Sequence, residues 1–138
     1  MSRNFRMVPV LAFVAATMMP ALSLAQADHS DCLLQQQRIT TVLPYRTGEH
    51  LGKAAVQQLR GARVFVQAAP GLTAEWLQLE FRRHLAGMKA ADMPDCVFDV
   101  DSVRVDVTSG GDGFWVTLRA STQKDGQEVL RRARLLLG

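Results

Sequence analysis

The sequence predicts an α+β domain in which a small antiparallel or mixed sheet carries helices on one face. Residues 102–108 and 114–120 each alternate apolar and polar side chains, as is typical of strands with one buried face. Residues 73–88 and 123–137 instead repeat apolar side chains at helical spacing. Strands with a single apolar face need a covering layer, and helices with a single apolar stripe provide one.

The first 27 residues have the composition of a secretory signal peptide. A basic start at Arg3 and Arg6 leads into an apolar run over residues 7–24. The run is followed by small residues at Ala25 and Ala27, the pattern at which signal peptides are cleaved. We expect cleavage after Ala27, with cleavage after Ala25 as the alternative, and therefore a periplasmic protein.

Removal of the signal peptide changes the charge balance. It takes away two arginines, so 14 basic residues face 13 acidic ones and the net charge falls from +3 to +1. A nearly neutral chain offers no lysine and arginine stripe for a polyanion, and we expect no nucleic-acid partner. No later apolar stretch reaches the roughly 20 residues that span a bilayer, so we expect no stable membrane insertion and a soluble exported protein.

The polar, glutamine-rich segment 28–47 is expected to form an N-terminal arm or a short helix, and residues 48–138 a single α+β domain. Within that domain, Glu49–Leu59 is predicted to be a helix because apolar residues recur at four-residue spacing. Thr47 is suited to cap this helix and Gly61 to end it.

A strand and a second helix are expected next. Residues 63–69 contain consecutive β-branched and aromatic residues and end at a Pro70-Gly71 turn, which predicts a strand. Thr73 is suited to cap the helix that follows, and Glu75 lies in its first turn, where the helix dipole favours a carboxylate. The apolar stripe of this helix contains Leu77, Phe81, His84, Leu85 and Met88.

Residues 102–108 and 114–120 are expected to pair as a β-hairpin across the glycine-rich segment 109–113. The final helix can be capped by Ser121 or Thr122. Lys124-Asp125-Gly126 leaves a third strand open as an alternative to this helix. The resulting order, β-α-β-β-α preceded by a helical segment, is akin to a ferredoxin-like half.

Cys32 and Cys96 are the two cysteines of the chain, and both lie beyond the signal peptide. An exported protein meets an oxidising compartment, in which an even number of cysteines tends to be paired. We therefore expect a Cys32–Cys96 disulfide. In the chain-entropy model a crosslink of this span contributes roughly 4 kcal/mol to stability.

The sharpest chemical signal is a cluster of soft donor atoms between His84 and Cys96. His84 and Met88 are four residues apart on a predicted helix, so they project from the same face, and Met93 follows in the next loop. An imidazole with two thioethers favours Cu(I) or Ag(I) over magnesium or calcium. The alternative is that His84 and Met88 are core residues, because they share the apolar stripe. A disulfide would also remove Cys96 as a thiolate ligand.

The chain carries no motif that indicates an enzyme. The segment 109–113 lacks the following Lys-Ser/Thr of a phosphate-binding loop. Asp99 and Asp101 resemble the start of a calcium loop, but Val103 occupies the next ligand position.

Arginines on the last predicted helix are expected to form a solvated face: Arg131, Arg132 and Arg134.

Six short stretches, taken together, carry a resemblance to known proteins: Pro70–Gln78, Arg83-His84, Met88, Met93–Cys96, Gly111–Phe114 and Glu128–Ala133. In these stretches the chain resembles a group of small, uncharacterised exported proteins of Gram-negative bacteria. The resemblance covers roughly residues 48–135 and implies a periplasmic location. It implies no activity.

The sequence thus predicts a non-enzymatic periplasmic binding protein. Its most concrete version binds or buffers a soft metal, Cu(I) or Ag(I), through His84, Met88 and Met93. The alternative is a module that contacts another envelope protein and is stapled by a structural disulfide. Exposed aromatic residues often anchor interfaces, so the expected contacts are Trp76 on its helix or Trp115 on the outer sheet face, with Thr117 beside it.

Overall fold

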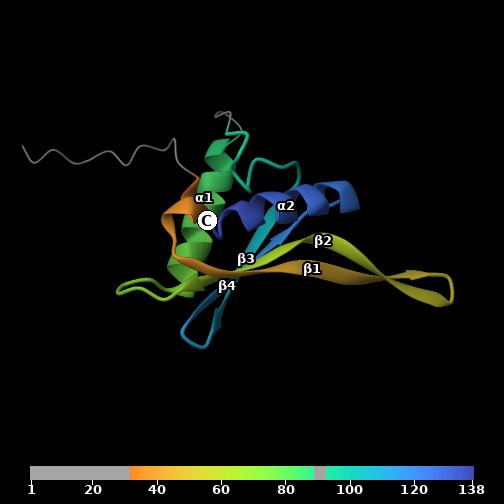
Figure 1. Cartoon of the computed structure of the whole chain (residues 1–138), viewed down its shortest axis with the longest axis horizontal. Helices are drawn as coiled ribbons and strands as arrows, with labels where there is room; N and C mark the ends of the chain where they lie inside the picture. The colour runs from red at the N-terminus through yellow and green to blue at the C-terminus, as the bar shows by residue number, and fades with distance from the viewer. Residues whose placement is uncertain (1–31, 89–92) are drawn as a thin grey trace, which may run out of the picture.

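The computed structural model describes residues 32–88 and 93–138, and the predicted signal peptide lies outside them (Figure 1). Within these residues a four-stranded antiparallel sheet packs with two α-helices, which confirms the predicted α+β class. After a short 3₁₀ helix the elements form two consecutive ββα units. Their bounds are Leu33–Gln36 for the 3₁₀ helix, Ile39–Leu51 for β1, Ala54–Gln67 for β2, Ala74–Met88 for α1, Arg104–Gly110 for β3, Gly113–Arg119 for β4 and Gln123–Leu135 for α2.

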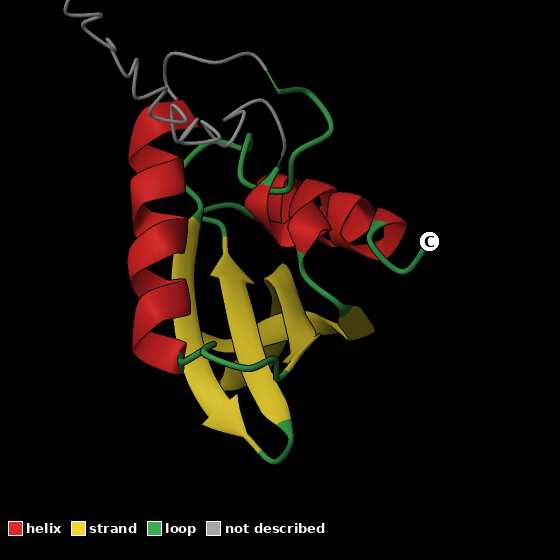
Figure 2. Cartoon of the chain, turned by 90° about the vertical axis from the view of Figure 1, so that its left-hand side faces the viewer, coloured by secondary structure: helices red, strands yellow, loops and turns green. Residues whose placement is uncertain are grey.

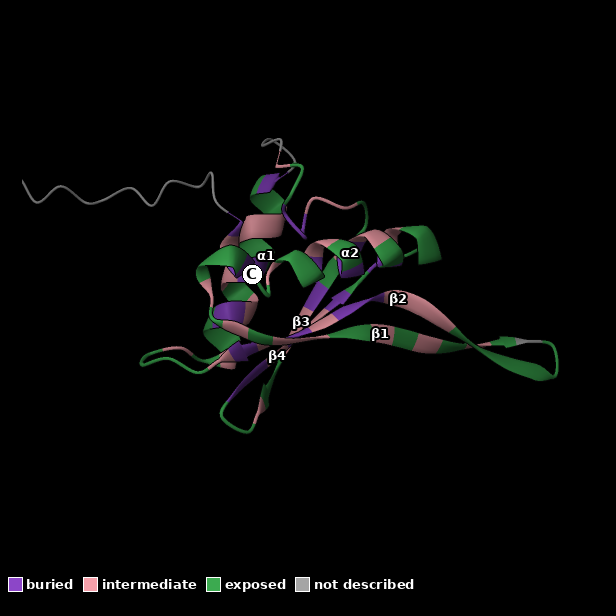
Figure 3. Cartoon of the chain, in the orientation of Figure 1, coloured by how far each residue is buried: buried purple, intermediate pink, exposed green. Residues whose placement is uncertain are grey.

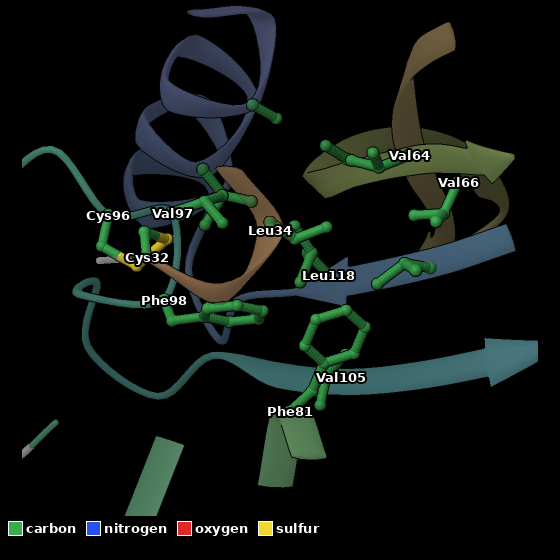
Figure 4. Packing of buried hydrophobic residues seen from close by; sticks show 14 of the residues in the cluster. Cys32, Leu34, Val64, Val66, Phe81, Cys96, Val97, Phe98, Val105 and Leu118 are labelled. Carbon is green, nitrogen blue, oxygen red and sulfur yellow. A yellow bond between two sulfur atoms is a disulfide. The ribbon is translucent and has the colours of Figure 1, made fainter. Parts of the chain in front are cut away.

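The strands lie in the order β1-β2-β4-β3, so the second strand of each hairpin is central. Helix α2 lies above β1 and β2 in Figure 1, and α1 runs alongside the sheet in Figure 2. Alternate residues of the central strands face the helices and are buried, while their neighbours face away. Figure 4 shows this interior. Its fully buried side chains include Leu34, Val64, Val66, Leu77, Phe81, Val116, Leu118 and Val129.

The predicted helix over Glu49–Leu59 is wrong, because this segment forms the far end of the β1–β2 hairpin. Glu49 pairs with Val56, and Gly52 adopts a positive φ of 67° in the turn. A spacing of four residues is also a multiple of two, so it places apolar residues on one face of a strand as well as of a helix. Residues 39–47 were expected in the N-terminal arm, but they belong to β1 because they pair with β2.

The far end of this hairpin projects beyond the rest of the molecule (Figure 1), and Figure 3 colours most of it as exposed. Arg60 connects its base to the body, since its guanidinium bonds the Glu49 carboxylate and also the Ser121 carbonyl that precedes α2. Pro44 lies in β1, at the edge of the sheet, where a strand tolerates a residue without a backbone N–H.

The strand predicted over residues 63–69 is the last part of the longer β2, and the elements predicted after it are confirmed to within two residues at their ends. Strands β3 and β4 form the expected hairpin, and α1 begins after Thr73, whose hydroxyl accepts from Trp76 N at 3.2 Å. Thr122 caps α2 by accepting from Asp125 N at 3.1 Å, so the alternative third strand is wrong. Gly126 is required by packing, because a Cβ there would lie 2.7–2.9 Å from the backbone of Arg60 and Gly61 in β2.

The free edge of β3 is occupied by a side chain from α1. Gln78 Nε2 donates to Val105 O at 2.9 Å, and Val107 N donates to Gln78 Oε1 at 2.7 Å. The side-chain amide therefore makes the two bonds that a neighbouring strand would make. Covering an edge in this way blocks further strand pairing there.

Replacing Gln78 by glutamate should lower the free energy of unfolding by about 2 kcal/mol, because the side chain loses its donor and places a carboxylate oxygen beside the Val105 carbonyl. Urea unfolding measures this loss. Repulsion from the Val105 carbonyl should also displace the carboxylate from the strand edge, so the Val107 N–H loses its acceptor and its amide exchange should accelerate. Glu80→Gln on the same helix is the matched control, since it removes only the ion pair with exposed Arg83. Unchanged exchange at Val107 would contradict this role of Gln78.

Candidate functional site

The predicted disulfide is confirmed. Cys32 and Cys96 are joined with a Cα–Cα distance of 5.2 Å, and both are buried. The bond ties the start of the 3₁₀ helix to the loop between α1 and β3, and Figure 4 shows it beside Val97 and Phe98. The crosslink thereby closes one corner of the core.

His84 lies at this corner, where its Nε2 is 3.7 Å from Cys96 Sγ. Its half-buried ring contacts the edge of Phe98, with centroids 5.5 Å apart. Ligand atoms of Cys32, His84 and Cys96 all lie within 4.8 Å of one another. The structure thus brings together a histidine and two sulfurs that are far apart in the sequence.

The two methionines of the predicted metal set have different surroundings. Met88 is 7% exposed and belongs to the hydrophobic core, and Met93 is half-buried and packs against it. Both therefore already serve the packing role that the alternative interpretation assigned to Met88. Metal binding by His84, Met88 and Met93 stays a prediction.

Arg132 connects the disulfide corner to α2. Its Nη1 donates at 2.8 Å both to Cys96 O and to Asp99 O, and its side chain is 14% exposed. The expected solvated face is wrong at this position, because the guanidinium satisfies two loop carbonyls instead of facing water. The pKa of the Glu128 carboxyl is lowered from 4.5 to about 2, most strongly by its hydrogen bond from Arg131 and next by the one from Arg132.

The second candidate site is the sheet face that points away from the buried core. The register places Arg63 and Phe65 of β2 beside Thr117 and Trp115 of β4. The indole ring contacts Phe65 edge-on at a centroid distance of 4.9 Å, and the Arg63 guanidinium lies 4.7 Å from its centre. The predicted contacts Trp115 and Thr117 therefore lie on the outer face, as expected.

This outer face carries an open groove of about 570 Å³. Three of its lining residues are arginines and three carry hydroxyl groups, against a single aspartate, Asp106, which forms an ion pair with Arg119. Guanidinium and hydroxyl groups are hydrogen-bond donors suited to carboxylates and phosphates. The lining consists of Pro44, Tyr45, Arg46, Arg63, Asp106, Thr108, Thr117 and Arg119. We call this set the arginine groove.

Trp76, the other predicted contact, lies on α1 and is 45% exposed. Leu79, one helical turn further along, is 48% exposed. The two exposed apolar side chains are three residues apart, a spacing that places them on the same side of the helix. Neither residue lines the arginine groove.

No family model matches the chain, and no curated protein or solved structure matches it. The resemblance to exported proteins of Gram-negative bacteria therefore stays a prediction. Across residues 32–88 and 93–138, no helix has both the length and the apolar character needed to cross a membrane.

Proposed function

We propose that this protein is an exported, non-enzymatic binding domain that docks an acidic, extended segment of another envelope protein. The observation that carries the proposal is the arginine groove beside the stacked Arg63 and Trp115 side chains. Export rests on the predicted signal peptide, and a disulfide is compatible with it.

The groove is partly organised before any partner arrives. Trp115 is held by the ring of Phe65, and Gly110 leaves room for the indole, since a Cβ there would lie 2.6 Å from Trp115 Cδ1. The indole in turn supports the Arg63 guanidinium. Side chains that are already ordered lose less conformational entropy on binding. Tryptophan, tyrosine and arginine are also the residue types that contribute most to interfaces.

Charge favours an acidic partner. The lining of the groove carries Arg46, Arg63 and Arg119 against Asp106, a balance of +2. The chain beyond the predicted signal peptide has a formal charge of only +1. Positive charge is therefore gathered at this face and balanced elsewhere, which steers acidic segments toward it.

The shape of the groove favours a protein segment over a small molecule. Its lining comes from all four strands of the described sheet, and it is open to solvent. Small-molecule sites are instead concave and enclose most of their ligand. An extended chain that crosses the strands would contact the three arginines and the hydroxyl groups together.

Photo-crosslinking in cells tests this proposal. A photoreactive amino acid at Thr108, on the rim of the groove, should yield an adduct whose crosslinked residues lie in a segment rich in aspartate and glutamate. Binding of that partner to the purified protein should then weaken as salt is raised.

Arg63→Glu should reduce the affinity for the captured partner by roughly tenfold or more. It removes the cation stacked on Trp115 and places a carboxylate in the groove, which repels an acidic partner. Arg134→Glu is the matched control, an exposed arginine on α2 outside the groove. An equal loss of affinity in both variants would mean that only the net charge of the protein matters and not the groove. Unchanged affinity in Arg63→Glu would overturn the proposal.

A further inference from the structure

We propose that Cys32, Cys96 and His84 form a redox-gated site that binds Cu(I) when the disulfide is reduced. In the oxidised protein each sulfur is bonded to the other, so neither is a thiolate and the site is closed. This site is separate from the arginine groove, because the two share no lining residue.

The position of His84 fits a metal site. A metal ion about 2.3 Å from a thiolate sulfur and about 2.0 Å from an imidazole nitrogen holds those two atoms roughly 3.5–3.8 Å apart. The distance from His84 Nε2 to Cys96 Sγ is 3.7 Å. This pair of ligands is therefore already at the required separation, and helix α1 holds the histidine there.

Opening the site requires movement of the two sulfurs. Sulfurs joined in any disulfide lie about 2 Å apart, whereas two thiolates on one metal ion lie roughly 4 Å apart. A change of rotamer at one cysteine moves its sulfur by this amount without displacing the backbone. The 3₁₀ helix and the loop carrying Cys96 can therefore stay in place.

The donor set selects a soft ion. Two thiolates and one imidazole complete a three-coordinate site, which suits Cu(I), whereas structural zinc sites use four ligands. Cu(I) with two thiolates has a net charge of −1. The guanidinium of Arg132 donates to Cys96 O at 2.8 Å and also pairs with the Glu128 carboxylate, so it offsets part of that charge.

The redox step balances with a dithiol reductant. The reductant transfers two electrons and two protons to the Cys32–Cys96 bond, which becomes two thiols, while the reductant becomes a disulfide. Cu(I) binding then releases two protons as both thiols become thiolates, and neutral His84 supplies a lone pair. Release of the ion uses a disulfide oxidant: exchange with it re-forms the Cys32–Cys96 bond, the two electrons reduce the oxidant to a dithiol, and Cu(I) loses both sulfur ligands.

Anaerobic copper titration of the exported protein tests the site. After reduction with a phosphine and removal of excess reductant, Cu(I) is titrated in competition with a chromophoric chelator. We expect one Cu(I) per reduced protein, none per oxidised protein, and a higher midpoint of thermal unfolding for the reduced protein when copper is present.

His84→Gln should weaken Cu(I) binding to the reduced protein by roughly tenfold or more, since it removes a ligand. Thermal unfolding of the oxidised variant checks that the fold is kept. The control is His50→Gln, an exposed histidine on the β1–β2 hairpin, which should bind as the unmodified protein does. Equal affinity in His84→Gln, copper uptake by the oxidised protein, or a reduced protein that copper neither binds nor stabilises would each overturn the proposal.

Discussion

Replacing Cys32 and Cys96 together by alanine is expected to lower the free energy of unfolding by about 4 kcal/mol. The two residues are 64 positions apart, so the bond removes much of the freedom of the unfolded chain. Small domains are stable by only about 5–15 kcal/mol, and the variant should unfold at a much lower urea concentration.

The control for this prediction is the unmodified protein after reduction, measured without metal. Its stability should fall close to that of the double variant, because both lack the same crosslink. The double variant should also fail to take up Cu(I). If reduction left the urea midpoint unchanged, the crosslink would not contribute to stability.

Gly61→Ala is expected to cost at least about 3 kcal/mol. Gly61 adopts a φ of 150°, and an added Cβ would lie 1.9 Å from the Leu118 carbonyl oxygen. That contact lies between β2 and β4, the central pair of the sheet, so the strands would have to separate locally. Urea unfolding measures the loss.

Gly52→Ala is the matched control, because Gly52 also has a positive φ, 67°, but nothing lies within 4 Å of its added Cβ. Its cost should be the backbone strain alone, about 1–2 kcal/mol. Equal destabilisation by the two substitutions would show that the close approach at Gly61 is unimportant.

Elements whose apolar residues repeat with an unambiguous period, of strand or of helix, could be predicted from the sequence. The alternation in β3 and β4 and the apolar stripe of α1 allow one interpretation each, and the threonines that cap α1 and α2 have the expected role. The far half of the β1–β2 hairpin has no buried face, since residues 52–57 are exposed, so no alternation reveals it. The four-residue spacing of its apolar side chains fits the period of a strand as well as that of a helix.

The candidate sites were less predictable, because they depend on contacts between distant segments. The disulfide followed from the number of cysteines and the expected compartment. Nothing in the sequence places His84 next to Cys96, since the loop between them has no regular period. Arg132 and Gln78 carry ordinary surface side chains, and their bonds to backbone groups depend on how the helices pack.

The amide bonds of Gln78 also limit how copies of this chain can associate through their strands. One edge of the described sheet is closed by α1, and β1 is at the other edge. A sheet that can grow at both edges can polymerise, whereas one that can grow at a single edge stops when two copies have met. Any strand-mediated self-association of the described fold therefore ends at a pair, and fibre growth would first require α1 to leave β3.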